Sequence, residues 1–294
     1  MKRVAVGLAA VVTAGVAVAG CGSSSSGAGV ATGKPAATTA IGTIPGCTPD
    51  ALKTVSSGEI TIGVDQPVYP PWFNDNKDPI GGDGYESAVD LAIAKRLGYS
   101  TDQIKVKRIS FTQAIGPAAR SFDFDLDEFS ITPAREKAVD FSAPYYDVAE
   151  AIVAMKGTKA AAATSLAAIA SLKLGAQSGS TDQQTISQVI KPSKSAFYAS
   201  NALAVQALKN GQIDGLVVDL PTAFYITGAQ VKGSVIVGQL PVGSNPEQFG
   251  ALLAKESPLT SCVSKAVDAL KDDGTLAAIG DKWLAKEADA PVLQ

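Results

Sequence analysis

The sequence predicts an α/β protein of two lobes, and three observations support this prediction. Strand-like and helix-like segments alternate along the chain, and they do so in two separate blocks. Two extended apolar segments, 149–155 and 249–254, join the blocks. Alternating strands and helices build helix-covered sheets, so each block predicts one α/β lobe and each apolar segment predicts one crossover. In such a design, the ligand site lies in a cleft between the lobes, at the carboxyl ends of strands.

The first block begins with residues 60–64, which alternate in polarity and lead into a Pro-rich loop. This pattern predicts a strand that opens into a binding loop. Apolar residues at helical spacing before Gly98 predict a helix that ends at this glycine. The expected order is strand 60–64, helix 87–97, strand 104–109, helix 112–119, strand 122–131 and a helix that begins at Thr132.

The second block follows an Ala-rich stretch, 160–171, whose pattern fits a helix or a loop. Its strands are expected at 173–176, 213–218 and 235–238, and its helices at 182–190, 201–210 and 222–226. Two further helices, 258–270 and 275–285, follow the second crossover.

Residues 1–20 have the pattern of an export signal. Lys2 and Arg3 precede an apolar run, 4–19, that ends in small residues. Cys21 follows directly, as in a bacterial lipobox, where such a cysteine carries lipid; an ordinary signal peptide with a chance cysteine is the alternative. Residues 21–48, rich in Gly, Ser, Ala and Thr, are expected to form a flexible tether. The protein is therefore predicted to lie outside the cytoplasm, lipid-anchored to the cell membrane.

Composition excludes several function classes. The chain has no histidine, which removes Ser-His-Asp and Cys-His catalysis and the usual zinc ligand sets. The formal net charge is −3, and loss of Lys2 and Arg3 with the signal makes it more negative, which argues against nucleic acid as a partner. An Asp-x-Asp-x-Asp run at 123–127 lacks the glycine and glutamate of a calcium loop. No metal and no cofactor are expected.

Two cysteines remain once Cys21 is assigned to the lipid. An even pair in an oxidising compartment predicts a disulfide between Cys47 and Cys262, with two free thiols as the alternative.

Two predicted helix starts suggest an anion site. Thr132 and Pro133 are typical of the N-cap and first position of a helix, which places Arg135 in the first turn, where a cation opposes the helix dipole. A bound anion would explain that arginine, although a solvated surface arginine fits equally. Ser180 and Thr181 precede the second-lobe helix, with Gln183 and Gln184 at capping-box spacing; a plain cap is the alternative.

Asp219 ends an apolar strand and adds a carboxylate at the same predicted edge. A clamp for a carboxylate together with a carboxylate for a cation describes an α-amino acid. The aromatic residues Tyr69, Trp72 and Phe111 follow strand ends and could flank the ligand side chain, with core packing as the alternative.

Several segments together resemble one protein family. The segments are Asp-Gln-Pro-Val-Tyr-Pro-Pro-Trp at 65–72, Gly-Tyr-Glu at 84–86 with 92–98, Ser-Ile-Thr-Pro-Ala-Arg at 130–135, and the stretches 139–146, 175–181 and 210–215. They resemble the amino-acid-binding members of the bacterial extracellular solute-binding proteins, family 3, of ABC importers, over about residues 59–284. The resemblance implies the type II periplasmic-binding-protein fold, with lobe 1 at 49–151 and 247–294 and lobe 2 at 152–246, closing by hinge motion.

The resemblance also implies roles for single residues. Arg135 would hold the ligand α-carboxylate, assisted by backbone groups at Ser130 and Thr181, and Asp219 would take the α-ammonium. Tyr69 and Phe111 would flank the side chain. Asp65, Trp72 and Ser180, which belong to the matching segments, complete the expected ligand-binding set with Glu128.

Glu128 departs from the family pattern. Strand alternation would place Asp123, Asp125 and Asp127 on one face and Glu128 with Ser130 on the other. The resemblance implies that the position of Glu128 approaches the ligand amino group, and a buried carboxylate without a partner is costly. This favours a basic or polar amino acid or a related amine. The alternative is that Glu128 caps a backbone group outside the pocket.

The leading hypothesis is a monomeric, lipid-anchored receptor that delivers an amino acid to an ABC permease and catalyses no reaction. The rival is an enzyme of the same fold, such as a cyclohexadienyl dehydratase-like lyase, with Glu128 or Asp219 as its catalytic carboxylate; a sensory ectodomain is a third class. Fold alone does not decide among them.

Overall fold

The structure is a computed structural model that describes residues 42–117, 120–241, 246–284 and 290–294. The predicted signal, Cys21 and the tether up to residue 41 lie outside the described residues. The predicted tether, residues 21–48, ends earlier in the structure. Ile44 donates its backbone N–H to the carbonyl of Arg96 at 3.1 Å, and Cys47 is buried, so the packed part of the chain begins before residue 48. Among the described residues, no helix has the length and apolar character needed to cross a membrane.

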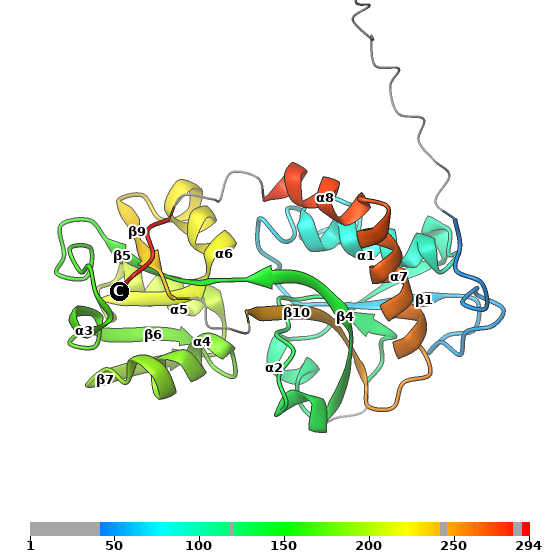
Figure 1. Ribbon diagram of the computed structural model, residues 1–294, viewed down its shortest axis with the longest axis horizontal. Coiled ribbons are helices and arrows are strands. Elements are labelled where there is room, and N and C mark those ends of the chain that lie inside the picture. The colour runs from blue at the N-terminus through cyan, green and yellow to red at the C-terminus, as the bar shows by residue number, and fades with distance from the viewer. Residues whose placement is uncertain (1–41, 118–119, 242–245, 285–289) are drawn as a thin grey trace, which may run out of the picture. The chain divides into compact units, whose positions relative to one another are not determined.

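Lobe 1 is built on a five-stranded sheet in the order β2-β1-β3-β10-β4. These strands are β1 (Ile60–Val64), β2 (Ile104–Arg108), β3 (Phe124–Asp125), β4 (Val139–Val148) and β10 (Glu247–Ala254). β1 pairs in parallel with β2 and β3, while β10 runs antiparallel to β3 and β4. Helices α1 (Tyr85–Arg96), α7 (Thr260–Asp272) and α8 (Thr275–Trp283) gather on one side of this sheet (Figure 1), and α2 (Phe111–Ala114) follows β2.

Lobe 2 repeats this arrangement with a sheet in the order β7-β6-β8-β5-β9. Its strands are β5 (Glu150–Met155), β6 (Lys173–Gln177), β7 (Lys194–Tyr198), β8 (Gly215–Asp219) and β9 (Ser234–Gln239). β6 is parallel to β7 and β8, and β5 is antiparallel to β8 and β9. The helices are α3 (Leu166–Ile169), α4 (Thr181–Gln184), which continues as π-helix η3 (Thr185–Ile190), α5 (Asn201–Lys209), and α6 (Leu220–Tyr225), which continues as π-helix η4 (Ile226–Gln230).

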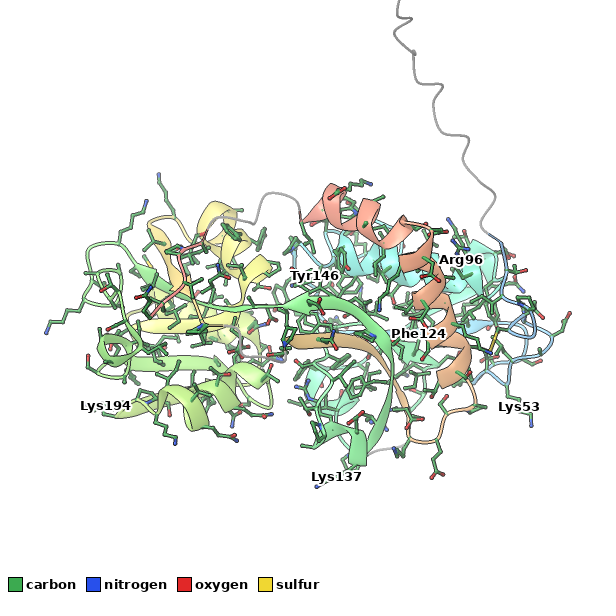
Figure 2. The ribbon with its side chains drawn as sticks, viewed as in Figure 1. Lys53, Arg96, Phe124, Lys137, Tyr146 and Lys194 are labelled. Atoms are coloured by element: carbon green, nitrogen blue, oxygen red, sulfur yellow. A yellow bond between two sulfur atoms is a disulfide. The ribbon has the colours of Figure 1, made fainter. Side chains whose placement is uncertain are left out.

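Each lobe has its own apolar core. The main core of lobe 1 lies between its sheet and the helices α1, α7 and α8, and a smaller cluster includes Phe111, Phe129 and Leu252. Lobe 2 has one apolar cluster on each face of its sheet. Figure 2 shows Phe124 in the core of lobe 1, whereas Lys53, Lys137 and Lys194 extend from the surface. Burial of apolar side chains is the main favourable contribution to the stability of both lobes.

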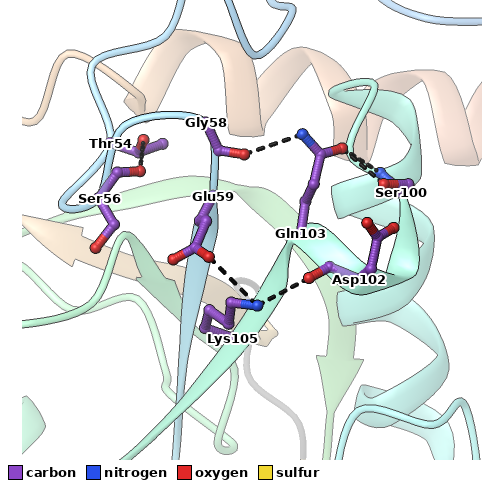
Figure 3. A network of polar contacts seen from close by, with 8 residues as sticks. All are labelled: Thr54, Ser56, Gly58, Glu59, Ser100, Asp102, Gln103 and Lys105. Atoms are coloured by element: carbon purple, nitrogen blue, oxygen red, sulfur yellow. Dashed lines mark hydrogen bonds and ion pairs between the residues drawn. The ribbon is translucent and has the colours of Figure 1, made fainter.

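Polar contacts fix the edge of the lobe 1 sheet where β1 and β2 begin (Figure 3). The short 3-10 helix η1 (Thr101–Gln103) begins at a capping box, in which Gln103 Oε1 accepts from the Ser100 N–H at 2.9 Å. Gln103 Nε2 also donates to the carbonyl of Gly58 at 3.0 Å, and Lys105 pairs with Glu59 at 3.3 Å. These contacts hold β2 beside β1 at their amino ends.

Two expected elements differ from the structure, and two strands of the structure were not expected. The expected strand 122–131 is regular only over β3, because Glu128 takes a φ of 54° and breaks the extended conformation. The helix expected after Thr132 is a single 3-10 turn, η2 (Arg135–Lys137). Strands β4 and β7 were not anticipated, because their mixed polar and apolar residues give no clear strand pattern.

The chain passes between the lobes where β4 leads into β5 and again between β9 and β10, as the two extended apolar segments predict (Figure 1). One boundary needs correction, because residues 290–294 lie on lobe 2 and not on lobe 1. Val292 pairs with Gln239 of β9, and Leu293 joins a lobe 2 core cluster. Cys47 and Cys262 form the expected disulfide, with Cα atoms 5.5 Å apart.

Candidate ligand-binding site

The carboxyl ends of strands from both lobes meet at one cavity. Asp65 directly follows β1, whereas Gln177 and Asp219 are the last residues of β6 and β8. This is the edge at which open α/β sheets bind ligands. The residues that line the cavity are Asp65, Tyr69, Phe111, Asp127, Glu128 and Arg135 from lobe 1, and Gln177, Ser180, Thr181, Asp182, Asn201 and Asp219 from lobe 2.

Hydrogen bonds between the lobes surround this cavity. Trp72 Nε1 donates to Thr222 Oγ1 at 2.8 Å, and Thr222 Oγ1 donates in turn to Glu128 Oε2 at 3.0 Å. The hydroxyl groups of Ser130 and Thr181 are 3.1 Å apart. The cavity is therefore enclosed by residues that hold the two lobes in contact.

Arg135 is positioned by the turn that the sequence predicted, even though the helix is short. Its backbone N–H donates to Thr132 Oγ1 at 3.2 Å, the bond expected of an N-cap. The guanidinium donates to the carbonyls of Ser130 at 2.8 Å and of Gly179, across the lobe boundary, at 3.1 Å. It also lies 5.4 Å from the centre of the Phe111 ring. Burial lowers the pKa of Arg135.

Ser180 caps α4 as predicted. Its Oγ accepts from the N–H of Gln183 at 3.1 Å, and Gln183 Oε1 accepts from the N–H of Gly179 at 2.7 Å. The capping interactions thus fix the turn that presents Thr181 and Asp182 to the cavity.

Carboxyl groups dominate the cavity lining. Five of them, Asp65, Asp127, Glu128, Asp182 and Asp219, face one cationic side chain, Arg135. Burial raises the pKa of Glu128 to about 7, and burial together with the charges of Asp182 and Glu128 raises the pKa of Asp219 well above its usual range. Glu128 and Asp219 approach each other across the lobe boundary, so the charge on Glu128 favours the protonated form of Asp219.

The lobe 1 end of the cavity combines carboxyl groups with an aromatic ring. Burial raises the pKa of Asp65, against the nearby charge of Arg108, and burial also raises the pKa of Asp127, reinforced by Asp65. The pKa of Tyr69 rises to about 12, because the ring is buried and Asp65 and Asp127 are close. This end is suited to a cation with an apolar stem.

Eight of the ten expected ligand-binding residues line the cavity, and Ser130 and Trp72 do not. Ser130 is buried beside Thr181, and its carbonyl accepts from Arg135. Trp72 is 1% exposed and packs edge-on against Tyr85, Tyr146 and Phe249 in the lobe 1 core. Trp72 is therefore a core residue, which is the alternative that the sequence analysis considered for the aromatic residues.

Four lining residues were missed, namely Asp127, Gln177, Asp182 and Asn201. Strand alternation was wrong for Asp127, because the chain leaves the extended conformation at Glu128 and both carboxyl groups reach the cavity. Asp182 begins the expected helix 182–190, where an acidic residue is common in the first turn and gives no sign of a cavity. Gln177 is the last residue of β6, and its side chain accepts from the N–H of Asn201 at 2.7 Å. Its position at the end of a predicted strand is the sequence feature that could have identified it as a lining residue.

The acidic lining does not amount to a metal centre. In the described parts of the chain, no cluster of three or more His, Cys, Asp or Glu side chains has the arrangement of a metal site. The carboxyl groups are spread over two lobes around an arginine, which suits an elongated organic cation with an anionic group.

Comparison with known proteins agrees with this geometry. The model of the bacterial extracellular solute-binding proteins, family 3, matches residues 60–286. The ABC transporter arginine-binding protein 1 of Escherichia coli (strain K12) is 28% identical over 232 residues, covering 76% of this chain and 90% of that protein. The ABC transporter glutamine-binding protein GlnH of Bacillus subtilis (strain 168) is 26% identical over 216 residues, covering 72% of this chain and 77% of that protein.

A solved structure supports the fold. An ancestral arginine-binding protein bound to arginine is 31% identical and superimposes with a TM-score of 0.64, covering 77% of this chain and 98% of that chain. The expected two-lobe α/β fold and the family resemblance are thereby confirmed.

Proposed function

We propose that this chain, which belongs to the bacterial extracellular solute-binding proteins of family 3, is a receptor for an amino acid with a positively charged side chain. The observation that carries the proposal is the excess of five carboxyl groups over one guanidinium in a cavity shared by both lobes. A neutral amino acid would leave most of these buried carboxyl groups without a partner, at a cost of several kcal/mol at least if they ionise. A ligand with an ammonium and a side-chain cation offsets that cost.

Each end of such a ligand has partners. The α-ammonium would lie between Glu128 and Asp219, which approach each other across the lobe boundary. The α-carboxylate would face Arg135, beside the turn formed by Ser180 and Thr181. The side-chain cation would reach the lobe 1 end, where Asp65 and Asp127 lie beside Tyr69.

Delivery to an ABC permease, lipid attachment at Cys21 and a monomeric state complete the proposed function. The leader pattern supports export and anchoring, and the family supports the permease as partner. Mass spectrometry of membrane-extracted protein is expected to find the mature chain beginning at a lipid-modified Cys21. Retention of residues 1–20 or an unmodified cysteine would contradict the anchor.

The receptor is tested by calorimetric titration of residues 42–294 with arginine, lysine, glutamine and glutamate. Arginine or lysine is expected to bind with a dissociation constant in the micromolar range or below, at least tenfold more tightly than glutamine, with glutamate weakest. Preference for glutamine or glutamate would keep the receptor but contradict the cationic ligand. Turnover of prephenate or arogenate by the purified protein would instead support the enzyme alternative.

A further inference from the structure

A second cavity, of about 490 Å³, lies on lobe 1. Its walls come from the first residue of α1, from β4, from the end of α7 and from α8. Within the described part of the chain, it shares no lining residue with the cavity between the lobes. Its volume is in the range of sites that bind small molecules, so it can hold a ligand of its own.

The floor of this cavity is aromatic and apolar. Tyr85 and Tyr145 line it and are each 2% exposed, and their hydroxyl groups are bonded within lobe 1. Tyr85 donates to the carbonyl of Tyr145 at 2.9 Å, and Tyr145 donates to Glu86 Oε1. Leu276 and Leu284, both buried, add apolar surface. Because the polar ends of the two rings are already bonded, the floor offers ring surface against which an apolar group can pack.

Exposed side chains of both charges stand around this floor. Asp147 of β4, Lys271 of α7 and Asp281 of α8 line the cavity. Asp147 Oδ1 accepts from Gln248 Nε2 at 2.7 Å. Among residues 42–117, 120–241, 246–284 and 290–294, no ion pair joins Lys271 to either carboxylate. A ligand with one ammonium and one carboxylate complements this arrangement, since each of its charges meets an opposite charge that the protein leaves unpaired.

The aromatic floor is in contact with residues that hold the lobes together. Tyr85 and Tyr146 pack edge-on against Trp72, with ring centres 5.8 and 5.4 Å away. Trp72 Nε1 donates to Thr222 Oγ1 of lobe 2, and Thr222 donates to Glu128 in the cavity between the lobes. A ligand that packs on these tyrosines is therefore separated from the lobe contact by one side chain, that of Trp72.

We infer that the second cavity binds a free aromatic amino acid, and that its occupation strengthens ligand binding between the lobes. The ligand ring packs on the tyrosines, its carboxylate faces Lys271, and its ammonium faces Asp147 and Asp281. The bound ring restricts Tyr85 and Tyr146 and so stabilises the position of Trp72 that bonds lobe 2. The second site stands independently of the proposed function, whereas the coupling rests on it.

The site is tested with L-phenylalanine, titrated into residues 42–294 by calorimetry with and without saturating arginine. Saturable binding is expected in both titrations, because the two cavities share no lining residue. Phenethylamine lacks the carboxylate and hydrocinnamate lacks the ammonium, and each is expected to bind at least about threefold more weakly, the scale of an exposed ion pair. Equal binding of the three compounds, or loss of phenylalanine binding in the presence of arginine, overturns the inference.

The variant Lys271→Gln places the ligand in this cavity. We expect it to weaken phenylalanine binding at least about threefold and to leave phenethylamine binding unchanged, since the amine has no carboxylate to face Lys271. Lys265→Gln, at another exposed position of α7, is the control and is expected to leave both unchanged. An equal effect of Lys271→Gln on the two compounds would show a structural role and contradict the assigned contact.

The coupling is tested by titrating arginine with and without saturating phenylalanine. We expect phenylalanine to lower the dissociation constant of arginine at least about fivefold, and arginine to lower that of phenylalanine by the same factor. Thr222→Val, which keeps the size of the side chain and removes its hydroxyl, should abolish this reciprocal effect while phenylalanine still binds. An unchanged arginine constant would overturn the coupling. Failure of arginine to bind would overturn the proposed function, while the phenylalanine titrations would still decide the second site.

Discussion

At the scale of single residues, Glu128 shows most clearly how the site is built. Its φ of 54° lies in the left-handed region, which costs a non-glycine residue on the order of 1–3 kcal/mol and is often retained at functional sites. The conformation is held by the buried Glu86, whose Oε1 accepts from the N–H of Glu128 at 2.8 Å and from the hydroxyl of Tyr145. The carboxyl group of Glu128 is thereby aimed at Asp219 and Thr222 of lobe 2.

Replacing Glu128 with glutamine removes the charge and keeps the size of the side chain. We expect the dissociation constant for arginine or lysine to rise roughly 10- to 100-fold, because a hydrogen bond to a charged group contributes about 1.5–3 kcal/mol. Calorimetric titration measures the change, and Glu136→Gln, at an exposed position in η2, is the control. Unchanged binding in Glu128→Gln would mean that this carboxyl group caps a backbone group and does not face the ligand.

At the scale of elements, residues 290–294 add an edge to the lobe 2 sheet. The N–H of Gln239 donates to the carbonyl of Pro291 at 2.8 Å, and the N–H of Leu293 donates to the carbonyl of Gln239 at 2.9 Å. Leu293 is 3% exposed in the lobe 2 core. This close approach requires a glycine, because a Cβ at Gly238 would lie 2.7 Å from both Leu293 Cγ and the carbonyl oxygen of Pro291.

Gly238→Ala should therefore displace this tail. We expect the free energy of unfolding to fall by about 1–3 kcal/mol, the usual cost of overpacking, with faster hydrogen exchange at the amides of Gln239 and Leu293. Gly228→Ala is a matched control in η4, where a Cβ meets no atom within 4 Å. Protection of both amides at the level of the unchanged protein would show that the tail adapts to the added methyl group.

At the scale of the whole molecule, buried carboxyl groups extend from the cavity to the lobe crossings. Glu150 begins β5 at the first crossing, and burial and the charge of Glu247 raise its pKa to about 7. Burial also raises the pKa of Asp182, and the charges of Glu150 and Glu247 add to this rise. The carboxyl groups at the two crossings and in the cavity therefore influence one another's pKa values. A bound cation and protons compete for these carboxyl groups.

This environment predicts how stability depends on pH. Glu128 and Glu150 have a pKa of about 7 in the folded protein against an ordinary value of 4.5, so between these values the folded chain binds more protons than the unfolded chain. The contribution of these two groups to the free energy of unfolding is therefore greatest below about pH 4.5. This contribution decreases as the pH rises to about 7, by on the order of 3 kcal/mol for each group. Aspartates with a lowered pKa, such as Asp140, change charge below this window.

Thermal unfolding between pH 5 and 8 at fixed ionic strength measures this dependence. We expect the unfolding midpoint of the ligand-free protein to fall over this range, and the increase produced by saturating arginine to be larger at pH 8, where the carboxyl groups are ionised. Glu128→Gln should show a shallower fall. A midpoint that stays level or rises with pH would contradict the raised pKa values.

Much of this protein follows from local sequence. Alternating polarity predicted β1, and apolar runs predicted β5, β6 and β8, because such patterns are local properties. The strand-end position of Asp219 predicted its place at the cavity, whereas Asp65 was expected from the family resemblance. Capping residues located the turns of Arg135 and Ser180 for the same reason. The oxidising compartment and an even cysteine count predicted the pair Cys47 and Cys262.

Tertiary structure alone decided the rest. The left-handed conformation of Glu128 depends on Glu86, which is distant in sequence, so alternation misplaced Asp127. Trp72 became a core residue because Tyr85, Tyr146 and Phe249 surround it. The carboxyl groups around Arg135 come from separate elements of the fold. Their combined charge cannot be predicted from a local sequence pattern, because electrostatic interactions in a buried site depend on distances in space and not on spacing along the chain.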